Sequence, residues 1–274
     1  MIQPELKAYR RCSDRHVLVL ETNLTYVEKC QIFHYADLVR KAGNELTGIM
    51  KKRYDQLVRT KRYRKLKSLY KRYKDADNKK ALKDVCDQMK EMQKQYDVTW
   101  DYCRTSMIPI GKKYGIDAVF ALTKAEDVFR GIEKCLYSDG ETVHFKKRGD
   151  LPCIRAKQIN RGIIMKQMNF KFKNIEFGVN IKDRYEQEEV DAILYYLKHA
   201  EFMDSIAANT YKETDICVST YRPCYVSLVC KKIRGKLRVY VHITIEGLSK
   251  PKQDRFGNMK PVSYTHLTLP TNSL

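Results

Sequence analysis

Two alternating segments near the C-terminal end constrain the fold of this chain most strongly. Residues 225–233 and 236–246 are separated only by Arg234 and Gly235. From Leu237 to Ile245 every second residue is apolar, and the residues between them carry polar groups. This period of two is typical of a strand with one buried face. The sequence therefore predicts a β-hairpin whose turn is residues 234–235.

A short apolar run near the other end predicts one more strand, at His16–Leu20 (HVLVL). A lone strand leaves its backbone groups unsatisfied, so we expect it to pair with the later sheet. Between them the apolar period becomes helical. The sequence thus predicts an α+β fold in which a long helical insertion, residues 26–137, interrupts a β domain. Further strands are expected at Thr142–Lys146 and within Arg161–Asn180, and a helix from Asp183 to about Met203.

Three helical stretches are expected within the insertion. The first begins after a Thr25 cap and runs to about Tyr73, with a bend at Gly43 or Gly48 as an alternative. Residues 75–78 (DADN) break the pattern. The second stretch passes through Trp100 and stops before Pro109. The third covers residues 117–137, with an inward face of Val119, Leu122, Val128, Phe129, Ile132 and Leu136.

Positive charge is concentrated in the insertion. Residues 51–80 contain 14 Lys or Arg and three acids, a net charge of +11, in a chain whose net charge is +20. Like charges three and four residues apart destabilise a helix, so such a helix is better tolerated beside a polyanion. This favours nucleic acid over two alternatives, a solvated helix face and an anionic membrane surface. The tyrosines among the cations either stack on bases or form a buried seam.

A second basic cluster follows the insertion at residues 146–161, where Gly149 and Pro152 predict a loop. Loops on a rigid sheet often supply phosphate contacts, and the alternative is plain solubility. The predicted nucleic-acid-binding residues of the two clusters are Lys51, Lys52, Arg53, Arg59, Lys61, Arg62, Arg64, Lys65, Lys67, Lys71, Arg72, Lys146, Lys147, Arg148, Arg155, Lys157 and Arg161.

No motif of a catalytic or metal site is present. The chain has no P-loop, dinucleotide, zinc-protease or serine-hydrolase pattern, and its six histidines are dispersed. Its nine cysteines contain no C-x-x-C pair, which favours free thiols in a reducing cytoplasm over a zinc site. The last predicted helix begins with four acids, Glu186, Glu188, Glu189 and Asp191. At this end they interact favourably with the helix dipole, which we expect in place of a metal site. We expect no catalytic residue, cofactor, small-molecule substrate, membrane span or secretory signal.

The order of these parts resembles a known family. The insertion ends in residues 128–136 (VFRGIEKCL), followed by 143–147 (VHFKK), and the β domain closes with 239–247 (VYVHITIEG). These features resemble the N-terminal half of TnpB, the transposon-encoded RNA-guided DNA endonucleases of insertion sequences. Members of this family also carry the name transposase, and they are related to the type V CRISPR effectors. In that family the insertion is the recognition lobe and the β barrel is the wedge domain, which together hold guide RNA and engage target DNA.

The resemblance implies five segments. Residues 1–25 would be the first strand of a β-barrel-like wedge domain, 26–137 the recognition-like insertion, 138–247 the rest of the wedge with one helix, and 248–261 a linker. The family's RuvC-type nuclease domain begins with a G-[IV]-D-x-G strand, which is absent here, as is the zinc ribbon. We therefore expect a guide-RNA and target-DNA binding half without catalysis. The Mg and structural Zn of the family would belong to the missing nuclease domain.

The last segment, residues 262–274, has no Lys, Arg, Asp or Glu. From Pro261 the string PVSYTHLTLPT resembles a translated sequencing-library adapter. We expect it to be an artefact that cut the reading frame near Pro261; the alternative is an ordinary polar tail. Two rival functions remain open: a complete non-enzymatic RNA-binding protein, ribosome-associated or RNA-processing, and a DNA-binding regulator. The sequence does not indicate the oligomeric state.

Overall fold

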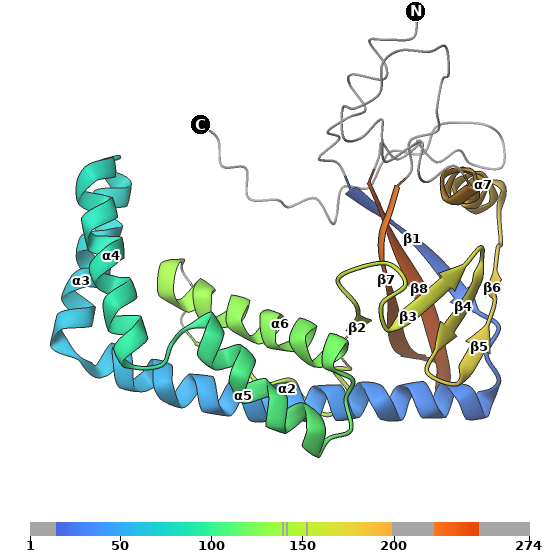
Figure 1. Cartoon of the computed structure of the whole chain (residues 1–274), viewed down its shortest axis with the longest axis horizontal. Helices are drawn as coiled ribbons and strands as arrows, with labels where there is room; N and C mark the ends of the chain where they lie inside the picture. Colours follow the sequence, from blue (N-terminus) through green and yellow to red (C-terminus); the bar gives the residue numbers. More distant parts are fainter. Residues whose placement is uncertain (1–14, 139, 141, 152, 199–221, 247–274) are drawn as a thin grey trace, which may run out of the picture. The chain divides into compact units, whose positions relative to one another are not determined.

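The computed structural model describes residues 15–138, 140, 142–151, 153–198 and 222–246 (Figure 1). The expectations for the linker 248–261, the adapter-like tail 262–274 and the helix end 199–203 lie outside these residues. The described part is mixed α+β, as predicted. It divides into two compact units: residues 15–23, 164–198, 222–226 and 240–246 form the β unit, and residues 24–163 and 227–239 form the helical unit.

The strands form two sheets. The five-stranded sheet has the order β2-β7-β8-β1-β6, and the three-stranded sheet the order β3-β4-β5. The bounds are β1 Arg15–Thr22, β2 Ile154–Arg155, β3 Ile163–Lys166, β4 Asn169–Phe172, β5 Ile175–Phe177, β6 Val179–Asn180, β7 Arg222–Ile233 and β8 Lys236–Glu246. The predicted hairpin and the predicted first strand are confirmed. β2, in a segment expected to be a loop, was not predicted.

β1 pairs with β8 in antiparallel register, with Arg15 opposite Glu246 and Leu20 opposite Val241. This confirms that the first strand joins the later sheet. Leu18 and Leu20 are buried, whereas Val17 and Val19 on the opposite face are 48% and 41% exposed. The alternation in β1 therefore sets which face contributes to the core.

The barrel expected from the resemblance is wrong for the described strands. The two edge strands of the larger sheet, β2 and β6, are two residues each and pair only with β7 and β1. β3, β4 and β5 form a separate sheet of three- and four-residue strands. Edges this short do not close the sheet on itself, and closure is what defines a barrel.

Helix α7, Arg184–Lys198, packs on β1 within the β unit. Its anchor is a buried hydrogen bond in which His16 Nε2 lies 2.7 Å from Glu189 Oε2. The Glu189 side chain is 1% exposed and that of His16 is 16% exposed. Two of the acids at the start of the helix contact residues close to them in the sequence. Glu186 accepts a hydrogen bond from the Lys182 amide, and Glu188 pairs with Arg184.

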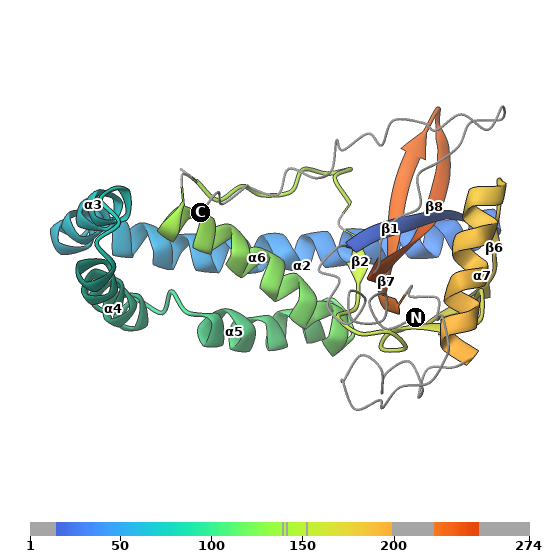
Figure 2. The same cartoon turned by 90° about the horizontal axis from the view of Figure 1, so that it is seen from above.

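Five helices make up most of the helical unit (Figures 1 and 2): α2 Tyr26–Arg59, α3 Lys61–Asp75, α4 Lys79–Gln95, α5 Trp100–Lys113 and α6 Ala118–Tyr137. α5 and α6 pack on α2 through buried residues that include Leu46, Met107 and Ile132. The Tyr35 hydroxyl fixes the turn between α5 and α6. It accepts from the Asp117 amide at 3.1 Å and donates to the Asp117 carboxylate at 3.2 Å.

Several helix boundaries differ from those expected. Thr25 caps α2 as predicted, but α2 continues without a break through Gly43 and Gly48 and ends at Arg59, with Thr60 as its C-cap. The Thr60 hydroxyl donates to the Leu57 carbonyl and accepts from the Tyr63 amide, which ends one helix and caps the next. The second stretch is two helices, because the chain turns at residues 96–99.

Pro109 lies inside α5 rather than beyond it. Its lost hydrogen bond is tolerated close to the end of the helix, where Met107 and Ile110 are buried. In α6, Leu122 is 40% exposed instead of inward, whereas Val128, Ile132 and Leu136 are buried as predicted.

Gly162 offers a test of the packing of the helical unit. Its φ is +82°, and a Cβ there would lie 2.6 Å from Phe120 Cζ, in a ring that is 2% exposed. We expect Gly162→Ala to lower the free energy of unfolding by about 3 kcal/mol, from the backbone strain and the clash together. Gly149 is the matched control, because its φ is +99° and no atom lies within 4 Å of its Cβ position. Gly149→Ala should lose only about 1 kcal/mol. Urea unfolding of both variants measures the difference, and equal losses would contradict the packing role.

Candidate nucleic-acid interface

Helix α3 exposes several cations on one side. Lys61, Arg64, Lys65, Lys71 and Arg72 recur at spacings of three, four and seven residues, so they share one side of the helix. All five are exposed. Tyr63 and Leu66, on the opposite side, are 0% and 6% exposed. We call these five cations the α3 basic face.

The tyrosine side of α3 is a packing seam. Tyr63 contacts α4 and α6 through Gln93, whose amide donates to the Tyr137 hydroxyl at 2.8 Å and to the Tyr63 hydroxyl at 3.5 Å. The rings of Tyr70 and Tyr137 meet edge to face at 5.8 Å. Burial raises the pKa of Tyr63. The sequence left two roles open for these tyrosines, stacking on bases or forming a buried seam. Tyr63 belongs to the buried seam and presents no ring for stacking on bases.

Most cations of the α3 basic face have no acidic partner. Lys61, Arg64, Lys65 and Lys71, and their neighbour Arg62, form no ion pair with any residue in the described part of the chain. Arg72 lies over the Tyr73 ring, 5.2 Å from its centroid. Lys67, nearer the seam, donates to the Cys135 carbonyl at 2.7 Å. Most of the positive charge on α3 is therefore not neutralised by acids in the described part of the chain.

Helix α4, which packs against α3, has five lysines and three acids, and two of its lysines are paired. Lys90 pairs with Asp87 at 3.5 Å and Lys94 with Glu91 at 3.1 Å. At the end of α2 some cations are paired with acids and others are not. Lys51 pairs with Asp55 at 2.7 Å and Arg53 with Asp97 at 3.6 Å, whereas Lys52 and Arg59 are exposed with no ion pair to a described residue. The exposed cations of the predicted first cluster that have no acidic partner among the described residues therefore lie on α3 and at Lys52 and Arg59.

The second predicted cluster begins in an irregular segment. The strand expected at Thr142–Lys146 does not form, and Asn44 of α2 binds the backbone of Lys146. The Lys146 amide donates to Asn44 Oδ1, and the Lys146 carbonyl accepts from Asn44 Nδ2, both at 2.9 Å. A residue bound in this way has no backbone groups left for a sheet ladder. Its side chain and those of Lys147 and Arg148 stay exposed.

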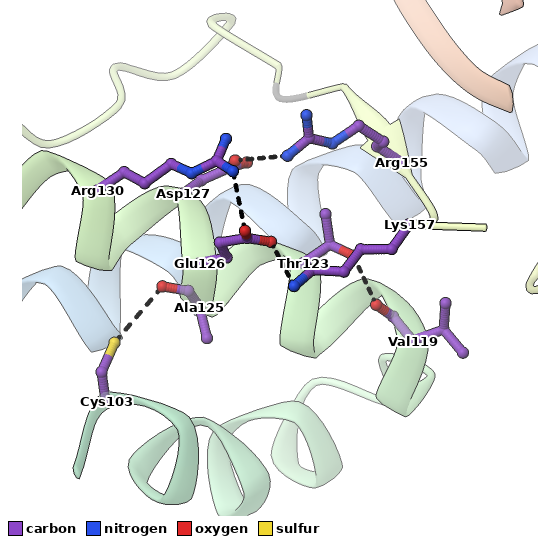
Figure 3. Close-up of polar contacts among 9 residues, drawn as sticks. All are labelled: Cys103, Val119, Thr123, Ala125, Glu126, Asp127, Arg130, Arg155 and Lys157. Atoms are coloured by element: carbon purple, nitrogen blue, oxygen red, sulfur yellow. Dashed lines mark hydrogen bonds and ion pairs between the residues drawn. The ribbon is translucent and has the colours of Figure 1, made fainter. Parts of the chain in front are cut away.

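Two other members of this cluster are held by α6 (Figure 3). Arg155 Nη2 lies 3.0 Å from Asp127 Oδ1, and Lys157 Nζ lies 2.7 Å from Glu126 Oε2. The hydrogen bond from Lys157 lowers the pKa of the Glu126 carboxyl, so this acid stays ionised beside its partner. Arg155 and Lys157 therefore anchor the segment to the helix. Arg161 is exposed and has no ion pair in the described residues.

The described cysteines are free thiols, among them Cys103 and Cys135, which are buried. Burial raises the pKa of Cys103 to about 12, and its sulfur lies 3.5 Å from the Ala125 carbonyl (Figure 3). Nowhere in the described part do three His, Cys, Asp or Glu side chains gather as a metal site would require.

Among the described helices, none combines the length and the apolar character needed to cross a bilayer. No family model matches the chain, and no curated protein matches it. The α3 basic face is the feature of the described residues that points most directly to a partner.

Proposed function

We propose that the helical unit binds single-stranded or irregular RNA through its phosphate backbone, with the α3 basic face as the central contact. The observation that carries this proposal is the row of exposed cations on one side of α3 without acidic partners. Unpaired like charges on one helix repel each other, and phosphates remove that repulsion on binding. Lys146, Lys147 and Arg148 add a second contact, in which Asn44 of α2 binds the backbone of Lys146.

The resemblance to TnpB extends this proposal to a biological role. In that reading the chain is the guide-RNA and target-DNA binding half of a cytoplasmic RNA-guided endonuclease. The β unit would take the wedge role and the helical unit the recognition role, with cleavage assigned to a RuvC-type domain. The order of the parts and the basic insertion support the assignment. Long-read sequencing of the source DNA beyond the codon for Pro261 tests it directly. A frame continuing into a G-[IV]-D-x-G strand would support it, and an immediate stop codon would favour a stand-alone RNA-binding protein.

RNA binding should depend steeply on salt. Each phosphate contact on a single strand contributes about 0.7 to the slope of log K against log salt concentration. Contacts from the α3 basic face alone therefore predict a slope of about −3.5, and the Lys146–Arg148 segment should make it steeper. Fluorescence anisotropy with a labelled single-stranded RNA between about 50 and 200 mM salt measures this slope. A flat response would exclude the α3 basic face as the interface.

The same titration with duplex DNA separates a regulator from an RNA-binding protein. A DNA-binding regulator places a recognition helix in the major groove and prefers duplex DNA. We expect the single-stranded RNA to bind more tightly than the duplex at equal salt.

A further inference from the structure

A pocket of about 910 Å³ lies within the helical unit. It is lined by Gly43 and Thr47 of α2, by Lys124 and Lys134 of α6, and by His144 and Lys146 of the irregular segment. Its volume is in the range of pockets that hold small-molecule ligands. All of these residues belong to one compact unit.

Lys124 is the unusual member of this lining. It is 8% exposed, although it is a lysine, and it lies among buried α6 residues that include Ala121, Ala125 and Val128. Gly43 makes room for it. A Cβ on Gly43 would lie 2.4 Å from Lys124 Cε and 3.3 Å from Cδ. The side chain therefore crosses α2 where the helix has no side chain of its own, and it reaches the pocket.

The Lys124 ammonium has no partner among the described residues. It makes no hydrogen bond or ion pair with any of them, and Asp127, its acidic neighbour, is paired with Arg155. Burial lowers the pKa of Lys124, Asp127 raises it in part, and Lys146 and Arg155 lower it further. Burying a cation without a counter-charge is unfavourable. An anion in the pocket would remove that penalty.

We propose that this pocket binds the phosphate group of a nucleotide, with Lys124 as the buried contact and Lys134 and Lys146 as outer ones. Three lysines line the pocket, and the described acid in its lining, Asp127, is already neutralised. The shared chemistry of the ligand is a nucleotide phosphate, from either a free nucleotide or a terminal nucleotide of the bound RNA. The second source rests on the proposed RNA binding, whereas the first is independent of it.

The test compares three probes on the full chain: a nucleoside monophosphate, a short RNA with a 5′ phosphate, and the same RNA without it. We expect the monophosphate to bind and the 5′ phosphate to strengthen RNA binding. Lys124→Met should reduce both effects about 10-fold or more, the usual worth of a hydrogen bond to a charged group. Lys112→Met is the matched control, because Lys112 is exposed on α5 and does not line the pocket. A thermal melt confirms that each variant folds.

Gly43→Ala is a second variant that keeps the charge. The new methyl group displaces the flexible end of Lys124, so it should weaken phosphate binding while the added alanine favours the helix. If RNA binds equally with and without the 5′ phosphate and no variant binds the monophosphate differently, the pocket proposal is overturned and RNA binding stands. If the monophosphate binds through Lys124 while RNA does not bind at all, the proposed function fails and the pocket stands as a nucleotide site.

Discussion

Replacing Lys61, Arg64, Lys65 and Lys71 by glutamine should lower the affinity for single-stranded RNA by on the order of 100-fold at about 0.15 M salt. Each lost phosphate contact removes about 0.7 from the salt slope, and four losses multiply at this ionic strength. The slope itself should become shallower by about 2.8. Stability should change little, since all four side chains are exposed and form no ion pair with a described residue. Anisotropy at several salt concentrations gives both the affinity and the slope.

Helix α4 supplies the matched control for this variant. Replacing Lys79, Lys83, Lys90 and Lys94 by glutamine removes the same number of charges from the other helix of the same hairpin. Because Lys90 and Lys94 already pair with acids, we expect a loss of less than about 10-fold. Equal losses in the two variants would show that RNA responds to net charge alone, and the α3 basic face would not be a site.

His16→Ala should destabilise the β unit by about 3 to 5 kcal/mol. The substitution leaves the Glu189 carboxylate without the histidine that lies 2.7 Å from it, in a place where its side chain is 1% exposed. A buried charge that loses its partner cannot recover its hydration. Thermal unfolding followed by circular dichroism measures the shift.

Two variants separate the lost partner from lost packing. In His16→Gln an amide can still donate to Glu189, so we expect less than half of the loss. In His16→Leu/Glu189→Leu the buried charge is gone, and stability should return close to that of the parent. If the double variant is as unstable as His16→Ala, packing rather than charge explains the effect.

Much of the fold could be predicted because local pattern and packing agree. The hairpin at residues 222–246, the pairing of β1 and the capped start of α2 all follow from short-range signals. The wrong predictions lie where a residue far away in the sequence contacts the segment. Gly43 does not interrupt α2, and the Lys124 side chain lies beside it where the helix has no side chain of its own. Thr142–Lys146 alternates like a strand, but it is irregular and Asn44 binds the backbone of Lys146. The barrel came from the resemblance, and the short edge strands do not support it.

In the candidate site, too, local features could be predicted and contacts with distant residues could not. The density of cations on α3 is visible in the sequence, and so is the side of the helix that they share. Which cations are neutralised is not visible, since Arg53, Arg155 and Lys157 find their acids 28 to 44 residues away in the chain. Lys124 was missed for a related reason. In the sequence it is one more polar residue in an amphipathic helix, and the structure is what shows that it is buried, as are its neighbours Thr123 and Ala125.

The register of β1 also has a consequence for biosynthesis. The strand leaves the ribosome early, yet its partner β8 pairs Arg15 with Glu246, near the other end of the described chain. At typical rates of about 5 to 20 residues per second, β1 waits roughly 10 to 45 s for that partner. The helical unit needs no part of β1 and most of it is complete well before β8 appears, so its helices can fold first. During this interval an unpaired strand with exposed valines is open to other chains, and a chaperone that covers β1 would protect the yield of folded protein.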